Sequence, residues 1–217
     1  MMTSLFSSFD PSSSFYQLNW TMMFLPSIVF PMNFWMKKSR ILMLKNKMLK
    51  KMSNEFNNST NHKEMIFLST SIMMFILINN SMGLFPYIFT ATSHISISMS
   101  LSIPMWMTFM IYGWTKFSNS MFKHLLPTGT PSAIMPMMII IETTGNLIRP
   151  ISLSVRLTAN MIAGHLLMTL LGDMNSIKTI LMIMPMQMML MTFESAISII
   201  QAYVFSTLIT LYSSEIP

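Results

Sequence analysis

Five ionisable side chains lie inside long apolar stretches of the sequence: Glu142, Arg149, Arg156, His165 and Glu194. A charged group in the middle of a lipid bilayer costs about 3 kcal/mol or more, so such residues face a protein interior or a water-filled space. Residues of this kind mark the path of an ion through a membrane. We therefore favour an ion-translocating role for them over a purely structural one.

Helical spacing assigns these groups to defined faces. Glu142, Arg149 and Arg156 are seven residues apart, so each lies only about 20° from the last on a helix. Asn160 lies about 40° beyond Arg156 and belongs to the same stripe. His165 follows Arg156 by nine residues and falls on the opposite face. The helix that carries them is predicted to separate two environments.

The last apolar segment has a polar seam of its own. Its members follow a seven-residue spacing, with Leu208 at the skipped position: Gln187, Glu194, Gln201 and Glu215. Small residues near Arg156 would let another helix approach closely, namely Ala159, Ala163 and Gly164. Two long helices, each with a polar seam, must therefore be positioned by the rest of the chain.

Composition indicates the environment of these helices. The 217 residues are 52% hydrophobic and only 9% charged, with no Cys. A water-soluble domain carries about a quarter of its residues as charges, which argues against an ordinary soluble enzyme. The lack of Cys excludes a disulfide-stapled secreted protein. No Asp, Glu, Lys or Arg occurs from Met65 to Thr115, which is enough for two membrane spans of about 20 residues. The fold class is therefore an all-α polytopic membrane protein.

We expect one membrane domain, 1–217, built from six helical segments. They are a first span over 15–34, a surface helix over 36–52, spans over 65–88 and 95–116, and two long helices over 132–171 and 176–212. The last two are too long for simple perpendicular spans. The polar stretch 53–63 is predicted to be a loop, and His94 is predicted to be solvated in a connection.

The basic segment Lys37–Lys51 contains more than half of the thirteen Lys and Arg. Its charges alternate with apolar residues, which favours an amphipathic helix on a membrane surface, with a solvated loop as the alternative. Cations stay on the side from which a membrane protein is inserted. With three crossings, this segment and the cations Lys116 and Lys123 share that side, the bacterial cytoplasm or the mitochondrial matrix. The N-terminus lies opposite.

Several motifs resemble subunit a of the mitochondrial F-type ATP synthase, in its animal, mitochondrially encoded form. The most specific is SVRLTANMIAGHLL at 154–167, followed by ESA at 194–196 and QAYVF at 201–205. Shorter matches are GLFPYIF at 83–89, GTP at 129–131 and IIET at 140–143. The abundance of Met fits an A+T-rich mitochondrial genome. The resemblance covers essentially the whole chain.

The resemblance implies a fold and a role for Arg156. One N-terminal span, a surface helix, two further spans and two strongly tilted long helices would pack around a rotating ring of c subunits. Arg156 would face this ring at mid-membrane, between two aqueous half-channels that do not meet. Because a guanidinium keeps its proton at any accessible pH, it would guide the ring's carboxylates past while preventing a direct proton leak.

The resemblance also gives roles to the other polar residues of the motif. Glu194 and His165 match the pair of the half-channel from the intermembrane side, with Gln201 and Asn160 as polar neighbours of Arg156. A buried Glu and a buried His suit a proton relay. This His and Glu arrangement is the mitochondrial one, because bacterial relatives exchange the two residue types.

Glu142 and Glu215 match acids at the matrix-side exit. Arg149 has no role that the resemblance supplies, and a second intramembrane cation needs a partner. Glu142 precedes it by seven residues, or about 10 Å along an ideal helix. We therefore expect these two residues to be too far apart for direct contact.

The sequence contains no phosphate loop, dinucleotide turn or nucleophile constellation, and no two His have metal-ligand spacing. We expect no cofactor, no metal, no nucleic acid and no direct nucleotide binding, so the chain is not an enzyme on its own. The resemblance implies a proton-translocating stator subunit of the Fo sector. Its partners would be the c ring, other Fo and peripheral-stalk subunits, and membrane lipid. Its place would be the mitochondrial inner membrane, with the N-terminus in the intermembrane space and 37–51 on the matrix side. The alternative is a passive membrane scaffold or another proton-coupled transporter subunit.

Overall fold

The computed structural model describes residues 5–12, 16–24, 26, 28, 37, 39–60, 63–85, 88–126, 129–132, 134–174 and 180–215. Within these residues every regular element is a helix, which confirms the all-α class. The α-helices are α2 (Arg40–Ser59), α3 (Lys63–Gly83), α4 (Ile95–Lys116), α5 (Ser118–His124), α6 (Met135–Asp173) and α7 (Ile180–Ser214). Short 3-10 helices are η1 (Leu5–Phe9), η2 (Leu18–Phe24) and η3 (Ala91–Ser93).

Among the described residues, four helices are long and apolar enough to cross a membrane: Glu64–Gly83 of α3, α4, α6 and α7. α6 has 39 residues and α7 has 35. At 1.5 Å per residue they measure about 58 and 52 Å, well above the roughly 30 Å of bilayer hydrocarbon. Of the first span expected over 15–34, residues Leu18–Phe24 form η2, and most of the remainder lies outside the described residues.

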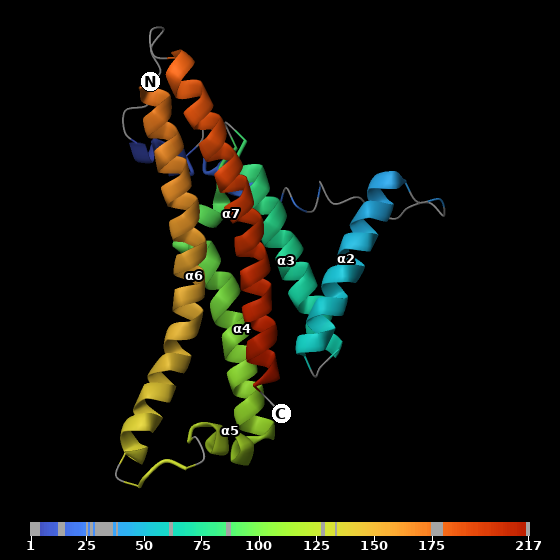
Figure 1. The fold of residues 1–217 in the computed structure, drawn as a ribbon, viewed down its shortest axis with the longest axis vertical. Coiled ribbons are helices and arrows are strands. Elements are labelled where there is room, and N and C mark those ends of the chain that lie inside the picture. Colours follow the sequence, from blue (N-terminus) through green and yellow to red (C-terminus); the bar gives the residue numbers. More distant parts are fainter. Residues whose placement is uncertain are drawn as a thin grey trace.

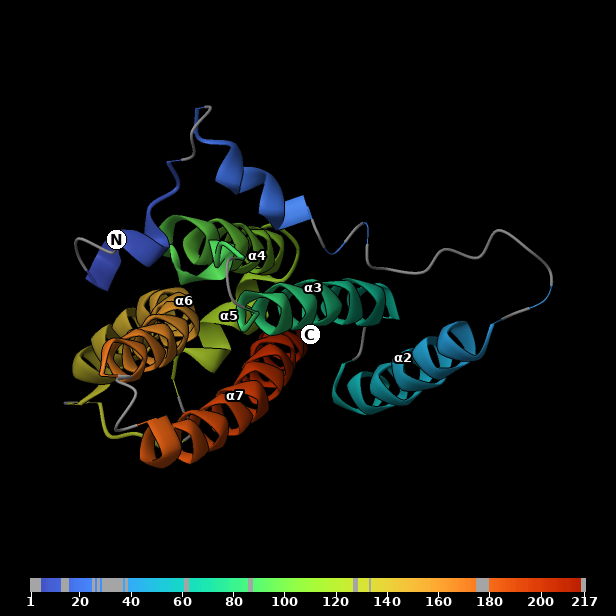
Figure 2. The ribbon, with the colours of Figure 1, turned by 90° about the horizontal axis from the view of Figure 1, so that it is seen from above.

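The bundle packs α3 along α7 and α4 along α6 (Figures 1 and 2). Helix α2 angles away from the bundle, and it contacts α3 and α7. The apolar core draws on α2, α3, α4, α6 and α7, and the residues with least exposure are Phe56, Ile76, Leu157 and Ala202. Small hydroxyl residues are buried between the helices, including Ser69, Ser98, Ser154, Ser198, Ser206 and Thr210. Such residues let helix backbones approach closely.

These buried hydroxyl groups bond within their own helices. Ser98 Oγ donates to the Ile95 carbonyl at 3.0 Å, and Ser206 Oγ donates to the Tyr203 carbonyl at 2.8 Å. Ser and Thr commonly bond back to a carbonyl three or four residues earlier. The spans can therefore contain many polar side chains without a partner from another helix.

Helix α2 differs from expectation at its C-terminal end. It begins at the N-cap Ser39, whose Oγ accepts a hydrogen bond from the Leu42 amide at 3.3 Å, and it continues to Ser59. The prediction of a loop over 53–63 is therefore wrong for 53–59. The reason is Phe56, which is only 1% exposed in the core, while the polar residues beside it face outward. The tertiary contact of one aromatic residue outweighs the loop-like composition.

The connection between α3 and α4 is drawn into the bundle. Ala91, Thr92 and Ser93 of η3 are buried, and η3 contacts α3, α4 and α6. The His94 ring packs against Trp20 at 5.1 Å and Phe89 at 5.3 Å between centroids. The prediction that His94 is solvated is therefore wrong, because η3 turns this residue inward.

Candidate functional site

One polar group lies at a close contact between α6 and α7. A Cβ built on Gly164 would lie 2.9 Å from both Cδ and Oε1 of Glu194, so the Glu194 side chain rests directly on the α6 backbone. His165 is the next residue along α6, and its ring lies 6.1 Å from that of Phe9. The absence of a side chain at Gly164 thus brings Glu194 to the turn of α6 that carries His165.

Buried polar atoms without a partner gather at this same end of the bundle. Glu194 Oε1 and His165 Nε2 are buried and make no hydrogen bond within the described part of the chain. Every other such side-chain atom lies at the end of α3 or in the connection after it: Asn79 Nδ2, both amide atoms of Asn80, Thr92 Oγ1 and His94 Nε2. Buried polar groups in proteins are almost always bonded to protein or to water. These atoms are therefore candidates for hydrogen bonds to water.

Sequence reasoning missed the contribution of α3 to this group. Asn80 is fully buried and Asn79 is 9% exposed. The signal that could have found them is two consecutive amides inside an otherwise apolar span. Two adjacent Asn side chains in a membrane helix need polar partners, as a charged side chain does.

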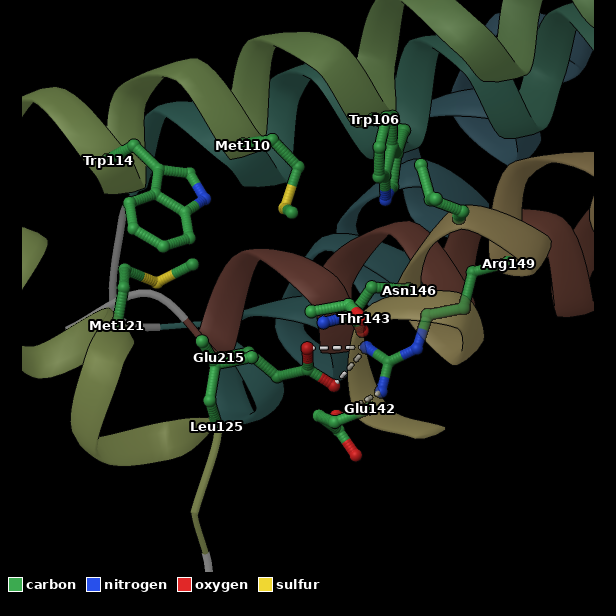
Figure 3. Close-up of a pocket in the computed structure, with 11 residues that line it drawn as sticks. Trp106, Met110, Trp114, Met121, Leu125, Glu142, Thr143, Asn146, Arg149 and Glu215 are labelled. Atoms are coloured by element: carbon green, nitrogen blue, oxygen red, sulfur yellow. Dashed lines mark hydrogen bonds and ion pairs between the residues drawn. The ribbon is translucent and has the colours of Figure 1, made fainter. Parts of the chain in front are cut away.

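A second polar group lies at the opposite end of α6. The N-terminal part of α6 diverges from α4 and α7 (Figure 1), and Pro150 lies inside the helix, where its missing N–H removes a helical hydrogen bond. A cavity of about 460 Å³ lies in this region. Trp106 and Trp114 line it from α4, and Glu142, Arg149 and Glu215 meet in its wall (Figure 3).

The charges in this wall form a chain. Arg149 Nη1 donates to Glu215 Oε1 at 2.7 Å and lies 2.5 Å from Oε2. Arg149 Nη2 lies 3.9 Å from Glu142 Oε1, in an ion pair without a hydrogen bond. The expectation that Arg149 and Glu142 are too far apart is therefore wrong, because two long side chains bridge the 10 Å or so that separate their positions on the helix. The partner of Arg149 across the helices, Glu215, was not predicted.

Arg156 lies between the two polar groups. It occupies the middle of α6, its side chain is exposed, and it forms no ion pair with any residue that the structure describes. Asn160 and Gln201 are half-buried, and neither is hydrogen-bonded to Arg156 in the described residues. The structure thus leaves the Arg156 guanidinium open on the outer face of the bundle.

Distances along the helices keep the two groups apart. Glu194 and Glu215 are 21 residues from each other on α7, or about 31 Å on a straight helix. On α6, Arg156 is seven residues from Arg149 and eight from Gly164, or about 10 and 12 Å. The two polar groups are therefore well separated along the bundle, and the Arg156 cation lies between them.

Long apolar helices with ionisable groups at two separate positions are typical of polytopic membrane proteins that carry ions. Residues 14–214 match the model of the family described as ATP synthase A chain, and the chain belongs to this family. It is similar to proteins named ATP synthase subunit a from three insects. Identity is 53% with that of Locusta migratoria, 48% with that of Drosophila melanogaster and 46% with that of Aedes albopictus, over the full length of both chains in each case.

Proposed function

We propose that the chain is the proton-translocating stator subunit of the Fo sector of a mitochondrial ATP synthase. It would form two offset half-channels against a rotating ring of carboxylate-bearing c subunits, with Arg156 between them. The observation that carries the proposal is an exposed, unpaired guanidinium in the middle of α6, between two separate polar groups. In lipid such a cation needs an anionic partner, and a ring carboxylate would supply one.

Glu194 and His165 would take protons from the intermembrane side. Their unpartnered buried atoms, together with those of Asn80 and Thr92, support a hydrated inlet that opens at this end of the bundle. A proton would pass from water through this pair to the carboxylate of a c subunit. The neutral carboxylic acid would then enter the lipid as the ring turns.

Release would occur at the opposite end of α6. After nearly a full turn the ring's acid would reach the cavity beside Glu142, lose its proton to water and return as a carboxylate to Arg156. The guanidinium would hold the ionised carboxylate without accepting its proton. Gln201 and Asn160, half-buried near the level of Arg156, would extend this polar surface.

The proposal includes a location and partners. The chain would be a multi-pass protein of the mitochondrial inner membrane, with the N-terminus in the intermembrane space and segment 37–51 on the matrix side. Besides the c ring, its partners would be other Fo subunits, the peripheral stalk and lipid. Large exposed apolar surfaces on α7 would meet them, for example at Leu181 and Met182, which are 89% and 81% exposed. Nucleotide chemistry would belong to other subunits.

A passive scaffold is the second candidate. The ion pair between Arg149 and Glu215 favours it, because this pair links α6 to the end of α7, and holding the helices together would be a sufficient role for it. The two candidates differ at Arg156, which forms no ion pair with any of the described residues.

The test is Arg156→Ala in the assembled ATP synthase, reconstituted into vesicles. We expect ATP-driven acidification and proton-driven synthesis to be abolished while the amount of assembled complex stays unchanged. Val155→Ala, an exposed neighbour in the same turn, is the control and should pump normally. An assembled Arg156→Ala complex that pumps at the control rate would refute the proposal, and loss of assembly would favour the scaffold.

A further inference from the structure

The cavity beside Glu142 has two carboxylates and one guanidinium in its wall, those of Glu142, Glu215 and Arg149. The two carboxylates differ in how they contact the guanidinium. Arg149 Nη1 contacts both oxygens of Glu215, at 2.7 and 2.5 Å. Its Nη2 is 3.9 Å from Glu142, beyond hydrogen-bond distance. Arg149 is therefore bound to one acid and only near the other.

The position of Glu215 at the end of α7 makes a nearby cation favourable. Glu215 follows the last residue of α7, and its amide bonds to the Leu211 carbonyl, so its carboxylate lies at the helix C-terminus. The negative end of the helix dipole disfavours an anion there, and the last turn contains no basic residue. Tyr212, one turn earlier, places its ring 5.1 Å from the Arg149 guanidinium. Two contacts from α7 thus hold Arg149 in place.

Glu142 is in the opposite situation. It belongs to α6 itself, lines the cavity and accepts no hydrogen bond from Arg149. A proton could join its carboxylate without separating α6 from α7. Protonation of Glu215 would instead remove the charge that ties the end of α7 to Arg149.

We propose that Arg149 is a positioning residue that keeps Glu215 in a permanent ion pair between α6 and α7, leaving Glu142 as the carboxylate that receives protons at this cavity. This inference rests on the proposed function. The proton leaves the carboxylic acid of the ring, reaches Glu142 through water in the cavity, and forms an O–H bond there. It then passes to water on the matrix side, and Glu142 becomes a carboxylate again.

Charge reversal tests this assignment in the assembled, reconstituted complex. Arg149→Glu and Glu215→Arg are each expected to lower ATP-driven proton flux by about tenfold or more, because each places two like charges together. The double variant restores the pair, and its Arg lies favourably at the C-terminus of α7. Its flux is expected to return to within about threefold of the unchanged complex. Adding Glu142→Gln should abolish flux in both the unchanged and the reversed backgrounds.

The results test the role of Arg149 and the role of Glu142 separately. A reversed pair that fails to assemble, or that pumps no better than the single variants, overturns the positioning role. A Glu142→Gln complex that assembles and pumps normally overturns the assignment of Glu142. Arg149→Lys keeps the positive charge but has one terminal nitrogen in place of Nη1 and Nη2. Its proton flux should lie between that of Arg149→Glu and that of the unchanged complex. If Arg156→Ala also leaves flux intact, the proposed function itself is wrong, whereas a loss at Arg156 without rescue of the reversed pair refutes only this inference.

Discussion

Replacement of Gly164 by Ala tests whether the position of the Glu194 carboxylate controls proton uptake. The new Cβ would lie 2.9 Å from Glu194 Cδ and Oε1, and 3.2 Å from Cγ. Ordinary contacts of a Cβ begin at about 3.4 Å, so the outer half of the Glu194 side chain must move by roughly half an ångström or adopt another rotamer. The α6 backbone does not need to move, because the obstructing atoms belong to a flexible side chain.

The magnitude follows from the cost of overpacking. An extra methyl group in a well-packed site costs about 1–3 kcal/mol. If proton transfer requires the native position of the Glu194 carboxylate, this energy adds to the activation free energy of proton transfer. The flux then falls by roughly 5- to 150-fold. The global stability of the complex should change little, because Ala favours a helix over Gly by about 1 kcal/mol.

The assay compares two glycines of the same helix. Gly145 also lies in α6, but a Cβ built there meets nothing within 4 Å. Gly145→Ala should therefore assemble and acidify vesicles at the unchanged rate. Equal flux in the two variants, with both complexes assembled, would refute the link between the Gly164 contact and proton transfer.

Two further changes probe the inlet and the packing of α2. Asn80→Leu replaces a fully buried, unpartnered amide by an apolar group of similar size; it should leave thermal stability unchanged or raised, yet lower flux by about tenfold by displacing water. Full flux in this variant would contradict a hydrated inlet beside α3. Phe56→Ala removes a core side chain that is 1% exposed and should cost about 3–5 kcal/mol, seen as faster proteolysis of α2. Phe67→Ala, at a site 80% exposed, is its control, and similar proteolysis of the two variants would show that Phe56 does not anchor α2.

The class of fold could be predicted because membrane insertion limits composition so strongly. Long uncharged runs are rare for any reason other than a span, and the structure has four such helices among its described residues. The candidate site could be proposed for the same reason, since a charge such as Arg156 stands out in apolar sequence. A helical period also placed Glu142 and Arg149 on one stripe correctly.

Two features could not be predicted from the sequence: how far a long side chain extends, and which residues from distant parts of the chain are in contact. A period gives the direction of a side chain but not its length, so the contact between Arg149 and Glu142 was missed. The pair with Glu215 joins residues 66 positions apart, and no local pattern contains that information. The helical path of 53–59 and the inward position of His94 depend in the same way on tertiary aromatic contacts, at Phe56 in one case and at Trp20 and Phe89 in the other.

The bonds that Ser and Thr make within their own helices bear on how the chain is assembled. Ser98 and Ser206 are satisfied as soon as their helices form, so each span can enter the bilayer without waiting for a neighbour. Arg149 differs, because Glu215, the carboxylate that is hydrogen-bonded to it, follows α7 and is absent until that helix has been inserted. Until α7 is in place, α6 therefore contains Arg149 with only Glu142 near it, and Arg156 with no ion-pair partner among the described residues.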